Sequence, residues 1–133
     1  MRDLIAAFSG AAQRRMADAG WHKRAGDIYS LELGDGFHAW LGLNRASHHV
    51  PLKINPVVGL RYDPVERLLV ELLGEPMGFS ATIAWPVGYL TPSRSFLQLR
   101  VAAEGDAELV AEELVALLKA PLPGGRGCVA LQG

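Results

Sequence analysis

The sequence predicts an α+β fold: an antiparallel sheet of about five strands, in the order α-βββ-α-ββ-α, with helices packed on one face. Three segments repeat apolar residues every three or four positions, which is the period of a helix with one buried side. Five other segments alternate apolar and polar residues, the period of a half-buried strand. Short, turn-like connections between these strands favour hairpins over parallel βαβ units.

Length and composition are those of one globular domain. The chain has 133 residues, of which 50% are hydrophobic, so it can bury a core without metals or disulfides. We expect a single domain over residues 1–120 and a loose tail over residues 121–133, where Pro121 and Gly124 end the last helix. The net charge of -1 lacks the basic excess of a nucleic-acid-binding protein.

The cysteine content and the absence of a targeting segment indicate the cytoplasm. Cys128 is the only cysteine, so no intramolecular disulfide can form. No apolar stretch reaches the ~18 residues of a membrane span, and the start lacks the apolar run of a signal peptide. Frequent Ala, Gly, Leu and Arg with only three Lys are typical of a GC-rich bacterial genome.

The first helix is predicted over residues 2–19, and the first hairpin over 27–33 and 37–44. Gly20 is placed to end the helix in the left-handed conformation. A three-residue loop, 34–36, with Gly36 left-handed, pairs position 33 with 37, 31 with 39 and 29 with 41. Only that register places the apolar residues of both strands on one face.

In the middle of the chain, the sequence predicts a strand followed by a helix with clear start and stop signals. Residues 50–62 keep apolar side chains at one parity, and Pro56 within them indicates an edge strand or two strands meeting at a bend. The helix begins after residue 62. Asp63 as N-cap, Pro64 at the first position and Glu66 at the third form a capping-box pattern. Gly74 ends this helix.

The remaining elements are a second hairpin and a last helix. Residues 80–87 and 95–102 alternate apolar side chains and are predicted to pair with each other. The last helix runs from about 107 to 119, with Asp106 as its cap.

One face of the predicted sheet stays free of helices and carries the candidate binding residues. Trp40 is expected to stand there among polar and charged groups, because an exposed ring supplies contact area and charges supply orientation. The same pattern also fits an ordinary solvated sheet face. The candidates on this face are Glu32, His38, Trp40, Asn44, Lys53, Asn55 and Arg61.

Glu32 and His38 face each other across the first hairpin and are the residues of a possible enzymatic or ligand-binding site. A carboxylate beside an imidazole can orient it as a general base, although such pairs are commonly modest surface contacts. No nucleophile is placed beside them, so no catalytic residue is assigned. His48 and His49 lack metal-ligand spacing, and no nucleotide or hydrolase motif is present. No cofactor or metal is therefore indicated.

Two further segments are candidates for recognition. The stretch 85–92 is rich in aromatic, Pro and Gly residues, and Tyr89 within it and Arg94 just after it join the candidate binding set. A basic cluster lies around the end of the first helix. Its members suit either a helix C-terminus or an anion-binding patch, and they are Arg14, Arg15, His22, Lys23 and Arg24.

The first 60 residues resemble a group of small bacterial domains of unknown function that begin with a helix, a Gly-aromatic-basic-basic step and a β-meander. The matching residues are 20–24, Ile28, Tyr29 and 53–55. Some domains of this kind are immunity-like, and the resemblance implies a protein partner but no catalytic residues.

We therefore expect a domain that binds a protein partner through the open sheet face and the aromatic loop, with no membrane or nucleic-acid partner. Two alternatives stay open: a small enzyme or ligand-binding protein with its site near His38 and Glu32, and a homodimer.

Overall fold

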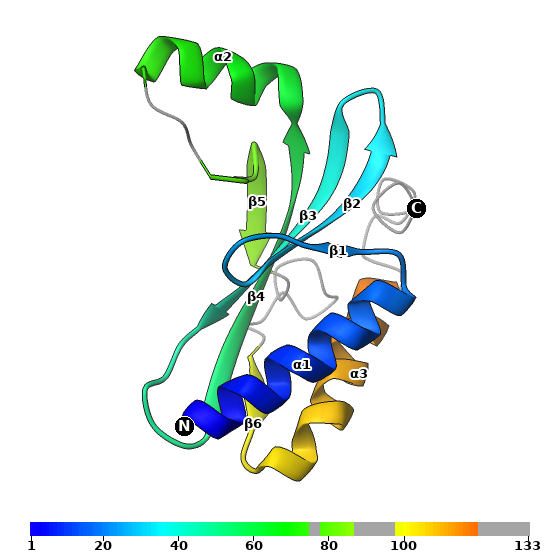
Figure 1. The fold of residues 1–133 in the computed structure, drawn as a ribbon, viewed down its shortest axis with the longest axis vertical. Coiled ribbons are helices and arrows are strands. Elements are labelled where there is room, and N and C mark those ends of the chain that lie inside the picture. The colour runs from blue at the N-terminus through cyan, green and yellow to red at the C-terminus, as the bar shows by residue number, and fades with distance from the viewer. Residues whose placement is uncertain (75–77, 87–97, 120–133) are drawn as a thin grey trace.

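The computed structural model describes residues 1–74, 78–86 and 98–119, and these form an α+β fold in the predicted order (Figure 1). Five strands follow one another in the sheet in chain order, and the sixth also pairs with β4; every pairing is antiparallel. The elements are α1 (Arg2–Asp18), β1 (His22–Lys23), β2 (Ile28–Gly34), β3 (Phe37–Arg45), β4 (Leu52–Tyr62), α2 (Asp63–Leu73), β5 (Ile83–Pro86), β6 (Leu99–Val101), the 3-10 helix η2 (Glu104–Asp106) and α3 (Ala107–Lys119). The predicted tail lies outside the described residues.

The first helix ends where its sequence predicts. Gly20 adopts a left-handed φ of 94°, and the next N–H, that of Trp21, donates to the carbonyl of Met16 at 2.9 Å. This bond satisfies a carbonyl that the helix end leaves free. The chain is thereby turned toward β1, and Trp21 packs against the core.

The first hairpin keeps the predicted apolar register by a different route. Leu31 pairs with Ala39 and Tyr29 pairs with Leu41, as predicted, but Phe37 pairs with Gly34 rather than with position 33. Asp35 and Gly36 both have positive φ, so the loop has two residues of the type that matches strand twist. A bulge between positions 32 and 34 supplies the extra residue that we assigned to the loop.

Pro56 lies inside the sheet, so the prediction of an edge strand or of two strands was wrong. β4 is one continuous strand that pairs with β3 along its whole length. On its other side, β6 pairs only up to Ile54 and β5 begins to pair at Val57, so no strand among the described residues pairs with Pro56 there. The residue opposite, Leu43, donates its N–H to Asp27 instead. The missing N–H of proline therefore breaks no ladder bond.

The two late strands do not pair with each other where they are described, so the predicted second hairpin was wrong there. β5 pairs with residues 57–60 of β4, and β6 pairs with residues 52–54 of the same strand. The two therefore lie end to end along one edge of β4, which is long enough, at 11 residues, to accept both.

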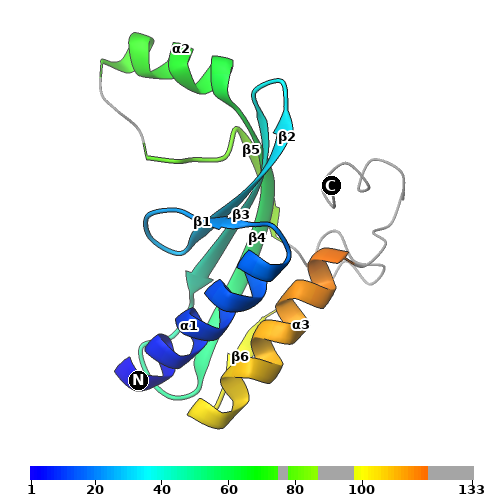
Figure 2. The ribbon, with the colours of Figure 1, turned by 45° about the vertical axis from the view of Figure 1, so that its right-hand side comes forward.

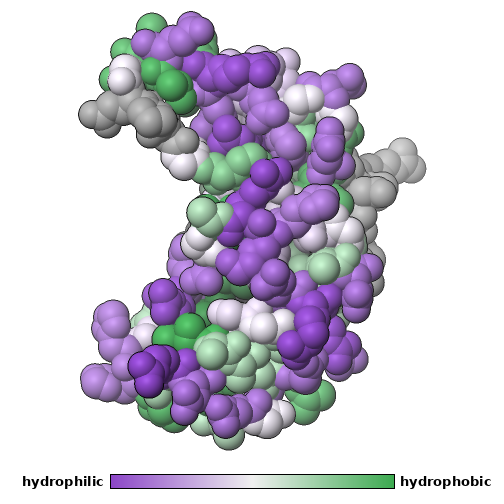
Figure 3. Space-filling model, viewed as in Figure 1, coloured by the Kyte–Doolittle hydropathy of each residue, from purple (hydrophilic) through white to green (hydrophobic). Residues whose placement is uncertain are grey.

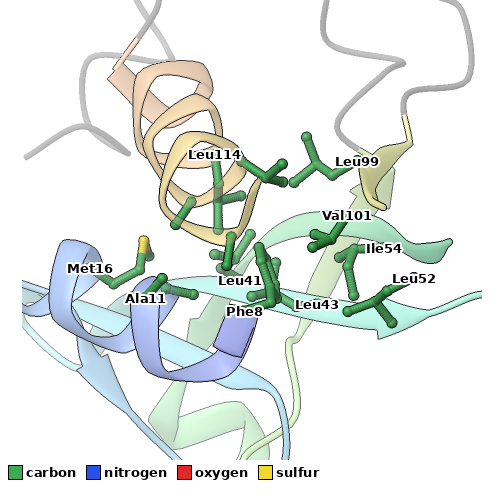
Figure 4. Close-up of a cluster of buried hydrophobic side chains, with 14 of the residues drawn as sticks. Phe8, Ala11, Met16, Leu41, Leu43, Leu52, Ile54, Leu99, Val101 and Leu114 are labelled. Atoms are coloured by element: carbon green, nitrogen blue, oxygen red, sulfur yellow. The ribbon is translucent and has the colours of Figure 1, made fainter. Parts of the chain in front are cut away.

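The hydrophobic core lies between α1, α3 and one face of the sheet (Figure 2). Side chains from both helices and from β2, β3, β4 and β6 meet there, and many are less than 2% exposed (Figure 4). The labelled members include Phe8, Met16, Leu41, Leu52, Ile54, Val101 and Leu114. We call this part of the molecule the helix-covered end.

The second helix stands at the opposite end of the sheet, away from the core (Figure 1). Its apolar side, which the sequence predicts to be buried, faces outward, whereas its charged Glu66 is only 4% exposed. The apolar residues, which we call the α2 stripe, are Val65, Leu68, Leu69, Leu72 and Leu73. All but the half-buried Leu69 are exposed, by 37% to 72%.

Candidate functional site

The predicted candidates on β2, β3 and β4 share the sheet face opposite to α1 and α3, as strand parity predicts. Glu32 lies beside His38, which in turn lies beside Arg61 in the register of the three strands. Farther along, Asn44 lies beside Asn55. The candidates thus form two groups, one toward α2 and one toward the helix-covered end.

In the group toward the helix-covered end, the described side chains do not converge on a common site. Asn44 is exposed, and the side-chain oxygen of Asn55 accepts a hydrogen bond from Gln98 at 2.9 Å. Lys53 is half-buried on the same strand as Asn55. Tyr89 and Arg94, the other two candidates, lie outside the described residues.

The group toward α2 is covered by Phe79, which the sequence did not single out. Its ring lies between two guanidinium groups, 4.3 Å from that of Arg24 and 4.2 Å from that of Arg61. The ring also meets the imidazole of His38 edge-on, with centroids 5.4 Å apart. The sheet face is therefore not an open platform at this end, which corrects the expectation drawn from strand parity.

Trp40 is held in the same cluster and is partly buried, so it is not the free ring that we expected. Its indole N–H donates to the carbonyl of Phe79 at 2.8 Å. The ring lies over Gly42, where an added Cβ would stand 2.6 Å from a ring carbon. Gly42 therefore makes room for the flat placement of the indole against the strand.

Asp63 joins the sheet to α2 through its carboxylate. One oxygen lies 3.0 Å from Nε2 of His38, and the other accepts from Nε of Arg61 at 3.1 Å. Burial alone would raise the pKa of Asp63, but the hydrogen bonds from His38 and Arg61 outweigh it and lower the pKa below its usual range.

Glu66 is the buried acid at the base of α2. Its two oxygens accept hydrogen bonds from the hydroxyl groups of Ser80, at 2.8 Å, and Thr82, at 2.9 Å. Arg61 lies 3.8 Å from the same carboxylate and donates to the carbonyl of Ser80 at 2.9 Å. Segment 78–82 is thereby tied to both the sheet and the helix.

These contacts show why the capping-box prediction was wrong. The N-cap of α2 is Tyr62, with no side-chain cap, and Asp63 is already within the helix. Both acids that the pattern assigned to the helix end are instead bonded to groups from the sheet and from segment 78–82. A long-range network has replaced the local one. We call it the Phe79 cluster: Arg24, His38, Trp40, Arg61, Asp63, Glu66, Phe79, Ser80 and Thr82.

His38 keeps one ring nitrogen without a partner. Nδ1 is buried, and within the part of the chain that the structure describes it has no hydrogen bond. The residue also borders a hollow of about 340 Å³. The lining residues are His22, Lys23, Arg24, Ser30, Glu32 and His38. The predicted Glu32 and His38 therefore share a concave, polar surface.

The basic cluster around the end of α1 does not form one patch. Arg14 and Arg15 both bond to Glu108 of α3, and their hydrogen bonds lower the pKa of that carboxyl. Lys23 donates to the carbonyl of Gly26 at 2.7 Å, while Arg24 donates to the hydroxyl of Ser30 at 2.9 Å. These cations therefore already have partners within the chain.

A second hollow, of about 600 Å³, opens between α1 and the ends of β2 and β3. Asp27 and Arg45 form a loose ion pair of 3.6 Å beside it. Farther inside, burial and the charge of Asp27 raise the pKa of Tyr29 to about 12. Of the predicted candidates that the structure describes, Asn44 borders this hollow.

Apolar side chains are also exposed on the sheet at the α2 end, on the face that α1 and α3 cover elsewhere. Phe37 and Tyr62 stack with ring centroids 4.3 Å apart. On the next strand, Ile83 is 53% exposed and Trp85 is 41% exposed. Because Ile83 pairs with Leu60 and Trp85 with Val58, all of these project from one face. We call Phe37, Leu60, Tyr62, Ile83 and Trp85 the sheet patch.

Among the described residues, no three His, Cys, Asp or Glu side chains are grouped as a metal site. No helix in the described ranges has the length and apolar character to cross a bilayer.

Some residues of the Phe79 cluster carried a recognisable pattern in the sequence, and others carried none. Asp63 and Glu66 were noticed, but as helix caps. Ser80 and Thr82 share one parity just before a strand, which is a signal for paired hydroxyl donors. Phe79 stands in a short segment without periodicity, so nothing in the sequence marks its contact with two arginines.

Comparison with protein-family models, with curated proteins and with solved structures found no match for this chain.

Proposed function

We propose that the protein is a protein-binding domain whose docking surface lies at the α2 end. The observation that carries this proposal is the inverted burial of α2, whose acid is covered while its aliphatic residues are exposed. In the view of Figure 3, a few hydrophobic residues are exposed at this end among mostly hydrophilic ones. Contiguous exposed apolar surface is typical of interaction sites.

The sheet patch is the part of this surface that fits a partner protein. It presents three aromatic rings and two aliphatic side chains on one rigid face. Aromatic side chains supply much of the binding energy at protein interfaces, because they bury a large area at low entropy cost. The partner's matching surface is an apolar segment that covers Trp85 and the Phe37–Tyr62 stack.

The test introduces a charge into the sheet patch and compares it with a charge elsewhere. Ile83→Glu should remove a partner that wild-type protein captures from cells and binds again when both are purified. Arg100→Glu, at an exposed strand position outside the patch, is the matched control and should bind normally. The expected rise in Kd for Ile83→Glu is at least ~10-fold. Equal affinity of the two variants would contradict the proposal.

A second candidate function is supported by the unpartnered Nδ1 of His38. A small ligand that enters the hollow beside Glu32 would meet an imidazole held at its other nitrogen by Asp63. Such a pairing orients the ring for binding or proton transfer. This is a ligand-binding role near His38 and Glu32, and it assigns no nucleophile.

Inorganic phosphate is a suitable probe of this second candidate, since Lys23 and Arg24 border the same hollow. NMR spectra of the histidine rings should show His38 shifting with saturation as phosphate is added. His48 and His49, which lie in a distant loop, are internal controls. Equal small shifts of all the histidines would count against a site at His38.

We base the proposed cellular compartment on the composition of the sequence. The single cysteine and the Lys-poor composition support a bacterial cytoplasmic protein. The resemblance of the first 60 residues to small bacterial domains of unknown function, some of them immunity-like, supports a protein partner. The proposal therefore places the partner protein in the bacterial cytoplasm as well.

A further inference from the structure

We infer that the hollow between α1 and the ends of β2 and β3 binds a free α-amino acid with an aliphatic or aromatic side chain. The hollow measures about 600 Å³, within the range of ~300–1,000 Å³ that is typical of small-molecule sites. It lies at the helix-covered end, away from the sheet patch, so this binding is separate from the proposed function. Fixed walls, a pair of opposite charges and an apolar lining together carry the assignment.

The walls of the hollow are held in place by hydrogen bonds. The start of α1 lies beside the loop between β3 and β4, and both border the hollow (Figures 1 and 2). The carbonyl of Asp27 accepts from the N–H of Leu43 at 2.8 Å, which fixes the start of β2 against β3. In the loop, the hydroxyl of Ser47 donates to the carbonyl of Pro51 and accepts from the N–H of Lys53, both at 2.9 Å. A ligand therefore meets walls that need little ordering, which favours binding.

Asp27 and Arg45 bring opposite charges to the hollow but do not satisfy each other. Nε of Arg45 lies 3.6 Å from a carboxylate oxygen of Asp27, which is longer than a normal hydrogen bond. Within the part of the chain that the structure describes, neither side chain makes a hydrogen bond to another group, and both are accessible to solvent. The guanidinium thus keeps its N–H donors, and the carboxylate its acceptor sites, for a ligand. Farther inside, the raised pKa of Tyr29, about 12, keeps its phenol neutral, so it adds no competing negative charge.

A ligand with two opposite charges fits this pair better than a ligand with one. A lone carboxylate drawn to Arg45 also approaches Asp27, and a lone ammonium drawn to Asp27 also approaches Arg45, so each is repelled by the second group. A zwitterion pairs each charge with its opposite and leaves none unpaired. In an α-amino acid, one carbon carries both the ammonium and the carboxylate group. The two ligand charges are therefore close neighbours, as are those of Asp27 and Arg45.

Apolar side chains line the same hollow and set the preferred side chain of the ligand. They are Ile5 from α1, Ile28 from β2 and Leu43 from β3. An amino acid whose charges meet Asp27 and Arg45 places its side chain against this surface, which removes apolar area from water. The lining therefore favours aliphatic and aromatic amino acids over glycine.

NMR titration of the full chain with L-leucine tests the inference. The amide signals of Ile28, Leu43 and Arg45 should shift with saturation and with a Kd on the order of 1 mM, while those of Arg61 and Glu66 should stay in place. Isocaproate, which lacks the ammonium group, and isoamylamine, which lacks the carboxylate, should each bind at least ~10-fold more weakly than L-leucine. Glycine, which lacks the apolar side chain, should also bind more weakly.

Two nearly isosteric variants test the pair of charges. Asp27→Asn and Arg45→Gln each remove one charge, and each should weaken L-leucine binding by at least ~10-fold. Arg100→Gln, which removes an exposed cation from β6 outside the hollow, is the matched control and should bind normally. Because Asp27 and Arg45 are accessible to solvent, circular dichroism should show that both variants are folded.

Three results would overturn the inference. Shifts that do not saturate by about 20 mM L-leucine, or that spread equally to the α2 end, would exclude a site in this hollow. Equal affinity for L-leucine and isocaproate would exclude a zwitterion as the preferred ligand. Unchanged binding in Asp27→Asn and Arg45→Gln would exclude the role of the pair. None of these results changes the effect of Ile83→Glu on partner binding, which tests the proposed function by itself.

Discussion

The helix-covered end and the α2 end of the sheet are stabilised by different chemistry. Under α1 and α3, aliphatic side chains are buried and charges lie outside. At the α2 end, Glu66 is buried while Leu68 and Leu72 face outward. The first arrangement stabilises the fold through the hydrophobic effect. The second fixes the position of a helix by polar contacts and leaves its apolar residues exposed.

This difference predicts unequal stability along the molecule. An 11-residue helix is marginal in water without packing, so α2 depends on its contacts with Arg61, Ser80 and Thr82. Local opening of such a region costs less free energy than global unfolding. The predictions below test the two ends separately, beginning with the largest effect.

Leu114→Ala should have the largest effect. Leu114 of α3 is completely buried against the sheet, so its truncation removes apolar contacts and leaves a cavity. The free energy of unfolding in urea should fall by about 2–5 kcal/mol. A loss below about 1 kcal/mol would show that α3 does not pack as described, and Leu109→Ala, at an exposed position, is the control.

Glu66→Ala should come next and should act at the α2 end. Removal of the carboxylate leaves the Ser80 and Thr82 hydroxyls without their acceptor and Arg61 with less negative charge nearby. We expect a cost of about 2–3 kcal/mol, detected as loss of helical circular dichroism at lower urea than global unfolding. Glu66→Gln keeps acceptor and shape, so it should lose less. Equal losses in the two variants would contradict a hydrogen-bonded role.

Gly42→Ala should be smaller and confined to Trp40. The added Cβ would overlap the indole ring, which must move and lose its hydrogen bond to the Phe79 carbonyl. The expected cost is about 1–2 kcal/mol. In NMR spectra, the Trp40 indole N–H should exchange with solvent faster, whereas that of Trp21 should not change. An unchanged Trp40 signal would show that the ring does not lie over Gly42.

The pH dependence of Asp63 should be the smallest effect. Its pKa is lowered in the folded protein, so it contributes stability above the unfolded pKa of about 4, and this contribution is lost as the pH falls through the folded pKa. Wild type should exceed Asp63→Asn by about 1 kcal/mol or less at pH 6. The difference should shrink below pH 4. A stability difference between wild type and Asp63→Asn that grows as the pH falls would contradict a lowered pKa for Asp63.

Strand parity was predictable because it depends on local alternation. The pairing of Tyr29 with Leu41 follows from apolar residues that must share a face, and it holds although the turn itself differs. The bounds of α3 were also predictable from local sequence, since the predicted range of about 107 to 119 agrees with Ala107–Lys119. These features need no knowledge of distant contacts.

The candidate site was only partly predictable, because its contacts join residues far apart in the chain. Asp63 and Glu66 match a helix cap in sequence, and only the approach of segment 78–82 and of His38 gives them other partners. The sequence pattern predicts an exposed Trp40, whereas in the structure Phe79 covers it. Pro56 reads as an edge residue until two separate strands are seen to share β4.

Amide hydrogen exchange of dilute wild-type protein and of Glu66→Ala tests most directly whether the two ends are stabilised separately. In wild type, amides of α2 should open at a free energy well below that of amides in β3 and β4. Glu66→Ala should lower protection in α2 and leave that of β3 residues 39–43 unchanged. Equal protection of α2 and the central strands, or a uniform loss throughout the chain in the variant, would contradict the account.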